Sequence, residues 1–334
     1  MDTPSALVRH LDQYVIGQDD AKKTIAVAVH THYRKVDKAQ RDGADLTKSN
    51  VLLIGPTGTG KTLLCETLSR RLGVPFVTAS ATSLAQTRFV NDEIEAILQR
   101  LVDKAQGDID RAERGIVFID EIDKLRKTGE AAGGSSGESV QHALLKIMEG
   151  APVKLAAGRH LNTASILFIC GGAFVGLDNI MAQSHGFGFI GAGGGDSQAI
   201  LDRLNRRVKP TDLFAFGLIP EFTGRLPIVA NFGSLDRAAL ARILTEPRDS
   251  LANQFRDLLA AAGVELAIYP RVFEQIAELA FEYKTGARSL RGVFEEMMTP
   301  ILYVLPDHPE IGRVEIASLF SPPRLLPRAQ QPAG

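Results

Sequence analysis

The chain has 334 residues, of which 45% are hydrophobic and 23% charged, and its formal net charge is −1. It is long enough for two domains with separate cores. The near-zero charge argues against a basic field for nucleic acid or a membrane surface. Apolar runs reach only strand length, whereas a membrane-spanning helix needs about 20 apolar residues. Because the N-terminal residues also lack the features of a signal peptide, we expect a cytoplasmic protein with neither nucleic acid nor membrane as partner.

The sequence offers no arrangement typical of a metal centre. Cys65 and Cys170 are the two cysteines, and the seven histidines form no i, i+4 pair near acidic partners. We expect both cysteines to be buried small apolar residues, and we expect no zinc.

The first strong motif follows a helical segment at residues 7 to 40 and a polar linker at 41 to 50. A predicted apolar strand, Val51–Ile54, runs into G-x-x-x-x-G-K-T, and a helix is predicted over residues 61 to 72. The glycines let backbone N–H groups turn towards phosphates, while Lys61 supplies a cation and Thr62 a Mg²⁺ ligand. Phosphates would also lie at a helix N-terminus, which favours anions. The predicted nucleoside triphosphate site comprises Gly55, Pro56, Thr57, Gly58, Thr59, Gly60, Lys61, Thr62 and Leu63.

The second motif is a pair of carboxylates. A buried strand is predicted over residues 116 to 120, and it ends in Asp120 and Glu121. Asp120 would hold Mg²⁺, usually through water, and Glu121 would polarise the attacking water. By itself such a pair is often only a solvated strand end. Together with the phosphate loop it indicates hydrolysis of the triphosphate.

Strands and helices are predicted to alternate around these motifs. The remaining elements of the alternation are strands at 76 to 79 and 166 to 170 and helices at 92 to 105 and 140 to 149. This pattern indicates a parallel sheet with crossover helices, and ligands then bind at the carboxyl ends of the strands. Two glycine-rich segments, 126 to 137 and 186 to 196, interrupt it; each is either functional or poorly ordered.

The pattern becomes mostly helical from residue 235. Helices are predicted at 235 to 262, 270 to 279 and 289 to 305, with strands near 264 to 269 and 313 to 317. We therefore expect a nucleotide-binding domain over residues 1–232 and a smaller α+β domain over 233–320. The proline-rich tail, 321–334, is expected to be disordered.

Two arginines have contexts that suggest further nucleotide contacts. Arg225 follows a turn fixed by proline and glycine, and Arg288 begins a predicted helix of the second domain. A guanidinium suits the charge that develops on a transferring phosphoryl group, and a neighbouring subunit can supply it. From the residues alone, such an arginine is more often a surface residue in an ion pair.

The chain resembles the ClpX family of AAA+ unfoldases, ring ATPases that feed proteins to the ClpP peptidase. The resemblance extends from residue 11 to about residue 314 and rests on these stretches: 15–18, 55–62, 118–124, 136–146, 166–178, 216–227 and 284–291. It implies an α/β fold of the AAA+ P-loop NTPase kind, in which a parallel sheet with flanking helices precedes a smaller α+β domain. It also implies ATP and Mg²⁺ as cofactors and a homohexameric ring.

The resemblance assigns roles residue by residue. Val15 and Ile16 would pack on the adenine, and Arg288 would sense the nucleotide state. Arg225 would act across the subunit interface and complete the catalytic set with Lys61 and Glu121.

The chain departs from the family where substrate is expected to bind. The family's pore loop, Gly-Tyr-Val-Gly, is here Arg88, Phe89, Val90 and Asn91. Phe89 keeps an aromatic surface that can grip a polypeptide, and loss of both glycines predicts a stiffer loop. The entrance loop is shortened to residues 158 to 160, and residues 129 to 137, at the second pore loop, are mostly glycine, alanine and serine. The family's N-terminal zinc-binding module, built on four cysteines, has no counterpart in these residues, which we expect to be either an isolated ATPase core or a naturally shorter relative.

The family's peptidase-docking loop, Ile-Gly-Phe, aligns with Phe187, Gly188 and Phe189. An apolar tip there would fill a hydrophobic pocket; the alternative is a mobile insertion with no docking role.

The leading hypothesis is an ATP-dependent protein unfoldase and translocase that threads substrate proteins through a pore for a ClpP-type peptidase. The alternative is an ATP-driven remodeller of a specific protein complex that works without a peptidase. A nucleotide-dependent assembly scaffold that does not hydrolyse ATP is a third, and phosphate release distinguishes it from the others.

Overall fold

The computed structural model describes residues 2–43, 48–126, 137–155, 158–185 and 207–328. The chain folds into two compact units. The first unit contains residues 1–8, 20–56 and 65–232, and the second contains 9–19, 57–64 and 233–334. The domain limits expected from the sequence put residues 9–19 and 57–64 in the first domain, whereas in the structure both segments are part of the second unit.

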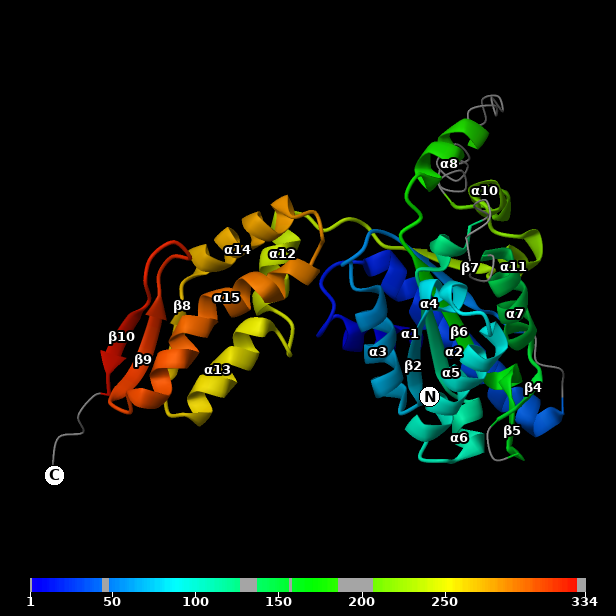
Figure 1. The fold of residues 1–334 in the computed structure, drawn as a ribbon, viewed down its shortest axis with the longest axis horizontal. Helices are drawn as coiled ribbons and strands as arrows, with labels where there is room; N and C mark the ends of the chain where they lie inside the picture. Colours follow the sequence, from blue (N-terminus) through cyan, green and yellow to red (C-terminus); the bar gives the residue numbers. More distant parts are fainter. Residues whose placement is uncertain (1, 44–47, 127–136, 156–157, 186–206, 329–334) are drawn as a thin grey trace. The chain divides into compact units, whose positions relative to one another are not determined.

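A five-stranded sheet of order β2-β3-β6-β1-β7 forms the centre of the first unit, and every neighbouring pair is parallel (Figure 1). The strands are β1 (Val51–Ile54), β2 (Phe76–Ser80), β3 (Ile116–Asp120), β6 (Leu167–Gly172) and β7 (Ile228–Asn231). Every residue of β1 and β6 is buried, as parallel strands covered on both faces require. All five carboxyl ends therefore lie at one edge of the sheet.

Helices and short elements surround this sheet. They are α1 (Pro4–Leu11), α2 (Asp19–Asp42), α3 (Lys61–Leu72), α4 (Ala81–Gln86), α5 (Val90–Lys104), α6 (Ile109–Glu113), η1 (Ile122–Leu125), α7 (Gly137–Glu149), η3 (Thr163–Ser165), α8 (Leu177–His185), α10 (Pro210–Phe216) and α11 (Pro220–Gly224). A small antiparallel hairpin joins β4 (Pro152–Lys154) and β5 (His160–Asn162). The predicted alternation is confirmed, and the strands at 51–54 and 116–120 and the helix at 61–72 have the predicted bounds.

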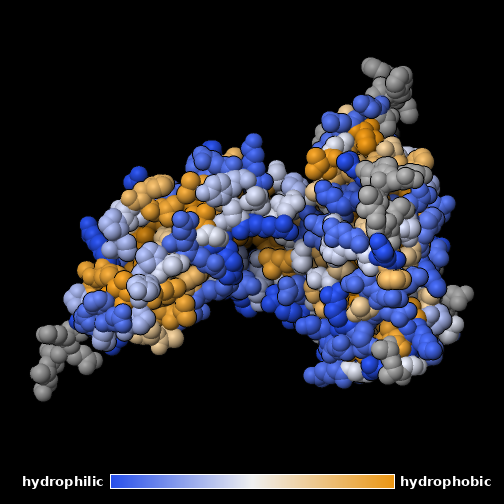
Figure 2. All heavy atoms as spheres, viewed as in Figure 1, coloured by the Kyte–Doolittle hydropathy of each residue, from blue (hydrophilic) through white to orange (hydrophobic). Residues whose placement is uncertain are grey.

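The second unit has its own three-stranded sheet, of order β10-β9-β8, and its own apolar core. Its elements are α12 (Arg237–Thr245), α13 (Leu251–Ala261), β8 (Glu265–Ile268), α14 (Pro270–Glu282), α15 (Arg288–Val304), η4 (Leu305–Asp307), β9 (Ile311–Ile316) and β10 (Arg324–Pro327). Strand β9 is parallel to β8 and antiparallel to β10. Apolar side chains also reach its surface (Figure 2), where Tyr303 is 81% and Phe320 73% exposed.

Two predictions for this region were wrong. The single helix expected over 235 to 262 is two helices, because Pro247 lies between them; proline lacks an N–H and restricts the residue before it. Ser250 then caps α13 by accepting a hydrogen bond from the Asn253 N–H. The tail expected to be disordered contains β10, which pairs with β9.

Among the described residues, no helix is long and apolar enough to cross a membrane.

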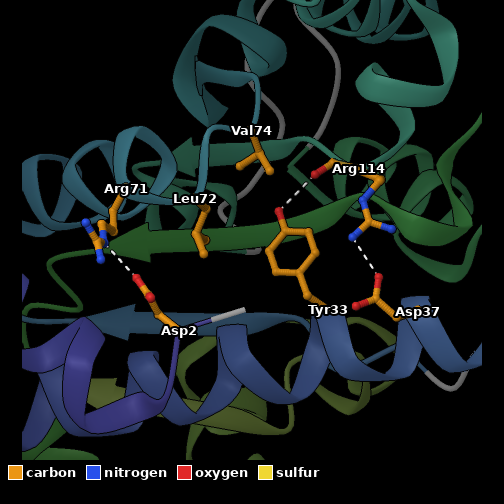
Figure 3. Close-up of a pocket in the computed structure, with 7 residues that line it drawn as sticks. All are labelled: Asp2, Tyr33, Asp37, Arg71, Leu72, Val74 and Arg114. Carbon is orange, nitrogen blue, oxygen red and sulfur yellow. Dashed lines mark hydrogen bonds and ion pairs between the residues drawn. The ribbon is translucent and has the colours of Figure 1, made fainter.

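Within the first unit, polar contacts hold helix α2 near the amino ends of β2 and β3. Figure 3 shows Tyr33 between two ion pairs, Arg71 with Asp2 at 2.6 Å and Arg114 with Asp37 at 2.8 Å. The Tyr33 hydroxyl donates a hydrogen bond to the Arg114 carbonyl at 2.8 Å. The hollow that these residues line has a volume of about 460 Å³. The charged groups that line the hollow neutralise one another in these two ion pairs. Together with the Tyr33 hydrogen bond, the ion pairs stabilise the position of α2.

Beside Tyr33, the buried imidazole of His32 makes a 3.0 Å hydrogen bond to the Ser165 carbonyl, with Nε2–H as donor. Burial, and then the charges of Lys48, Lys35 and Arg114, lower the pKa of His32 from 6.5 to about 4. The unfolded chain therefore takes up a proton on His32 at higher pH than the folded chain does.

We predict that His32 makes the folded state sensitive to acid. Its contribution is present above pH 6.5 and is lost as the pH falls towards 4, to a total of about 3 kcal/mol. Urea unfolding between pH 7 and pH 4.5 should show a steeper loss of stability for the parent than for His32→Gln. The exposed His142→Gln is the matched control and should keep the parent's slope. If the free energy of unfolding falls with pH equally in the parent and in His32→Gln, His32 is not the source of the acid sensitivity.

Candidate active site

The phosphate loop begins at the carboxyl end of β1, where neighbouring backbone segments are close together. The Gly55 N–H donates to the Gly172 carbonyl at 3.1 Å, and the Phe232 N–H donates to the Ile54 carbonyl at 2.7 Å. Gly55 has φ +155°, and a Cβ there would collide with the backbone carbonyl of Phe232. Only glycine lets the chain leave the strand at this point.

The rest of the loop, residues 57–64, belongs to the second unit. Gly58 and Gly60 have φ +79° and +94°, and the 12-residue helix α3 starts at Lys61, so the loop lies at a helix N-terminus, which favours anions. Thr59 and Lys61 are 4% and 7% exposed. The loop thus concentrates backbone N–H groups and one ammonium group, which together favour a polyphosphate.

Val15 and the start of α15 lie against the loop within the same unit. The Ala287 N–H donates to the Gly58 carbonyl at 3.1 Å, and Arg288, which is exposed, is the next residue. The Val15 Cγ1 atom lies 4.0 Å from the position of a Cβ on Gly60. Val15 and Ile16 are 4% and 7% exposed, so both side chains are buried. The structure therefore brings Val15 and the residue before Arg288 to the phosphate loop.

The predicted hydrolytic pair lies at the carboxyl end of β3, at the sheet edge where the phosphate loop begins. The Asp120 Oδ1 atom accepts a hydrogen bond from the Glu121 N–H at 2.9 Å. Glu121 has φ +60°, a left-handed conformation that costs a residue other than glycine about 1–2 kcal/mol. Such strain is typical of functional positions.

The structure adds two hydroxyls that the sequence analysis missed. Ser80 Oγ and Thr82 Oγ1 donate to the Glu121 Oε2 atom at 2.9 and 2.8 Å. Ser80 is paired with Asp120 in the parallel register of β2 and β3, and Thr82 follows in α4. Hydroxyl residues at the end of the strand adjoining an acidic strand end are the signal that would have found them. These bonds fix the direction of the carboxylate that is expected to polarise water.

Asp123 was also missed. Its carboxylate is 4% exposed and accepts from the Ala173 and Phe174 N–H groups at 3.3 Å each. These groups follow β6, the strand between β3 and β1, and Phe174 has φ +52°. Asp123 therefore ties the segment after the acidic pair to the end of the central strand.

Arg225 lies at the other edge of the sheet. It is the C-cap of α11, shortly before β7 begins, and its guanidinium forms a 2.6 Å ion pair with Glu149. Since the phosphate loop starts at the carboxyl end of the neighbouring strand β1, the fold separates Arg225 from the acidic pair of its own chain.

Of the predicted pore residues, Phe89 is 70% exposed and precedes α5 as its N-cap. Arg88 and Asn91 are also exposed, whereas Val90 packs against the core. Val90 and Asn91 are helical, so the segment that joins α4 to α5 is only 87–89. The predicted docking residues Phe187, Gly188 and Phe189, and residues 129–136 of the second pore loop, lie outside the described residues.

The fold and these motifs define an ATPase of the AAA class. A family model described as "AAA domain (Cdc48 subfamily)" matches residues 46–229, and one described as "C-terminal, D2-small domain, of ClpB protein" matches residues 235–312.

Individual relatives are similar over almost the whole chain. The ATP-dependent Clp protease ATP-binding subunit ClpX 3 of Methylococcus capsulatus is 43% identical over 99% of this chain and 83% of the relative. ClpX of Azotobacter vinelandii is 44% identical over 92% of this chain and 76% of the relative. ClpX of Bacteroides fragilis is 43% identical over 91% of this chain and 77% of the relative. The chain belongs to the ClpX family of ATP-dependent Clp protease ATP-binding subunits. The resemblance, the AAA fold and the ATPase activity expected from the sequence are thereby confirmed.

We predict that Glu121→Gln keeps ATP binding but slows hydrolysis by about 10²–10⁴-fold, since an amide cannot take a proton from water. Phosphate release and the fluorescence of a bound nucleotide analogue measure the two properties. The matched control is Glu95→Gln on the exposed side of α5, which should hydrolyse ATP at the parental rate. If Glu121→Gln also does so, another group polarises the water.

Proposed function

We propose that the chain is an ATP-driven protein unfoldase and translocase of the ClpX type. Six copies form a ring, substrate proteins are threaded through its pore, and a ClpP-type peptidase receives them in the cytoplasm. The relatives are named as ATP-binding subunits of an ATP-dependent Clp protease, which supports the peptidase as partner. Exposed aromatic side chains on the second unit, Tyr303 and Phe320 among them, support assembly, since large exposed apolar groups mark interaction surfaces.

We propose the following roles for the residues around the nucleotide. The phosphate loop and Lys61 hold the phosphates, Val15 and Ile16 contact the adenine, and Glu121 orients the attacking water. The Thr62 hydroxyl and the Asp120 carboxylate are oxygen donors of the kind that Mg²⁺ prefers, so these two residues would hold the ion. When bound, Mg²⁺ neutralises charge on the phosphates. Arg288 responds to the nucleotide state, and Arg225 stabilises the charge of the reaction in the neighbouring subunit.

One observation carries the link from hydrolysis to mechanical work. Phe89 is 70% exposed, and it follows α4, whose first turn is bound to Glu121 through Thr82 and the preceding Ser80. A change of the Glu121 carboxylate during hydrolysis therefore acts on a helix of only 6 residues that ends just before Phe89. An aromatic ring presented to solvent in this way grips a polypeptide through apolar contact, whatever its sequence.

The second candidate function is a peptidase-independent remodeller of a specific protein complex. It is favoured by Arg88 and Asn91, which replace the two glycines of the family's pore loop. Helix α5 already includes Asn91, so the segment has fewer free dihedral angles than a glycine-flanked loop. Arg88 adds a positive charge beside Phe89, which would favour acidic segments of a substrate.

We predict that Phe89→Ala uncouples the motor. Unfolding of a tagged, stably folded substrate should fall at least tenfold while phosphate release changes less than threefold, because Phe89 touches substrate and not the nucleotide. Phe89→Tyr should retain unfolding. Phe214→Ala, which truncates another exposed aromatic of the first unit, 57% exposed, is the matched control for loss of apolar surface. If Phe89→Ala unfolds substrate at the parental rate, Phe89 is not the gripping residue.

A pull-down with a ClpP-type peptidase separates the two candidate functions. Binding that is lost in Phe187→Ala and Phe189→Ala supports delivery to a peptidase. A chain that unfolds substrate but never retains the peptidase is the remodeller.

A further inference from the structure

Asn50, the residue before β1, has a buried side chain that the chemistry above does not use. It is 1% exposed, and its Nδ2 group donates to the carbonyl of Arg225 at 3.2 Å and to the carbonyl of Met148 at 3.3 Å. Glu149, the residue after Met148, is the ion-pair partner of the Arg225 guanidinium. One amide thus holds the backbone at both ends of the Arg225–Glu149 pair.

The two parts of this contact differ in strength. The Arg225 and Glu149 side chains are 53% and 46% exposed, so their ion pair contributes at most about 1 kcal/mol and is easily exchanged for another anion. The hydrogen bond from Asn50 to the Met148 carbonyl is buried and the one to the Arg225 carbonyl is partly buried. Loss of the donor leaves the buried Met148 carbonyl unsatisfied, at about 1–3 kcal/mol. The backbone of Arg225 is therefore fixed while its guanidinium stays exchangeable.

Neighbouring packing strengthens this hold on the backbone. Phe222 and Leu226, on either side of Arg225, are 0% and 2% exposed. In the parallel register of β1 and β7, Val51 is paired with Ile228, which brings Asn50 alongside the segment that leads from Arg225 into β7. The Asn50 Oδ1 atom is buried without a hydrogen-bond partner among the described residues. A buried oxygen without a partner costs free energy, so its presence in this side chain calls for an explanation.

We propose that Asn50 is a positioning residue for Arg225, and that Glu149 orients the guanidinium on this fixed backbone. This inference rests on the proposed action of Arg225 on the nucleotide of a neighbouring subunit. Such an arginine acts on the transition state, so a displacement of its backbone lowers kcat and leaves the KM for ATP nearly unchanged. A misplacement of 1 Å can cost on the order of 100-fold in rate.

Mixed rings test the proposal, because they separate a positioning effect from a loss of stability. A donor subunit carries Glu121→Gln and keeps Arg225, and an acceptor subunit carries Arg225→Ala and keeps its own hydrolytic pair. Each is nearly inactive alone. Mixing should restore phosphate release, since the donor's Arg225 serves the acceptor's nucleotide.

We predict that Asn50→Ala, placed in the donor, lowers the restored kcat about tenfold and changes the KM for ATP by less than about twofold. Placed in the acceptor, which has no Arg225 to position, the same substitution should have little effect. Glu149→Gln changes a side chain that is 46% exposed, so it should leave folding intact. It should lower the restored rate about two- to fivefold, again only in the donor. Thr163→Val is the matched control. It removes another buried hydrogen bond at the end of α7, to the Ile147 carbonyl at 2.7 Å, without touching Arg225, and should not distinguish donor from acceptor.

The outcomes are distinct. If the unmodified donor and acceptor fail to restore hydrolysis, the proposed action of Arg225 across subunits is wrong. If they restore it and both Asn50→Ala and Glu149→Gln act equally from either subunit, or not at all, Asn50 does not position Arg225. Should Asn50→Ala fail to fold, the donor-to-acceptor difference for Glu149→Gln decides the question.

Discussion

The parallel pairing of β1 with β6 and β7 is the constraint on which the rest of the structure depends. It places the start of the phosphate loop at one edge of the sheet and Arg225 at the other. The four residues of β1 span about 13 Å at the usual rise of a strand. Even an arginine side chain does not cover that separation across a packed core. We infer that the arginine works on another copy's nucleotide, and that assembly into a ring is a condition of catalysis.

The contacts around β1 and the groups proposed to act at the nucleotide differ in how deeply they are buried. The residues of β1 are fully buried, and Asn50 at its beginning fixes the backbone of Arg225 and the end of α7. The groups that would change partners in the proposed cycle are more exposed: the Arg225 guanidinium, the Glu121 carboxylate and the Phe89 ring. In the proposed mechanism buried hydrogen bonds set positions, while exposed contacts of low net energy can be exchanged at each step. The sheet would then transmit a change at the nucleotide to a short helix and an aromatic ring.

The sequence predicted those elements that depend on local rules. Glycine spacing, helix periodicity and a buried strand before an acidic pair sufficed for the phosphate loop, for α3 and for Glu121. It could not predict contacts set by strand order, because Ser80 meets Glu121, and Asn50 meets Arg225, only once β2 lies beside β3 and β1 beside β7. The interruption at Pro247 was visible in the sequence but was outweighed by continuous helical periodicity. Strand β10 could not be predicted from a proline-rich tail, because its pairing is supplied by β9.

The most direct test of an active site completed by a neighbouring copy is the specific ATPase activity measured against protein concentration, with sedimentation velocity on the same samples. If Arg225 acts on the nucleotide of a neighbouring copy, activity per chain is low where the chain is a monomer and rises in step with the fraction of assembled ring. The same activity per chain in a dilute sample that sediments only as a monomer would contradict this account, because a single chain would then contain every group that hydrolysis requires.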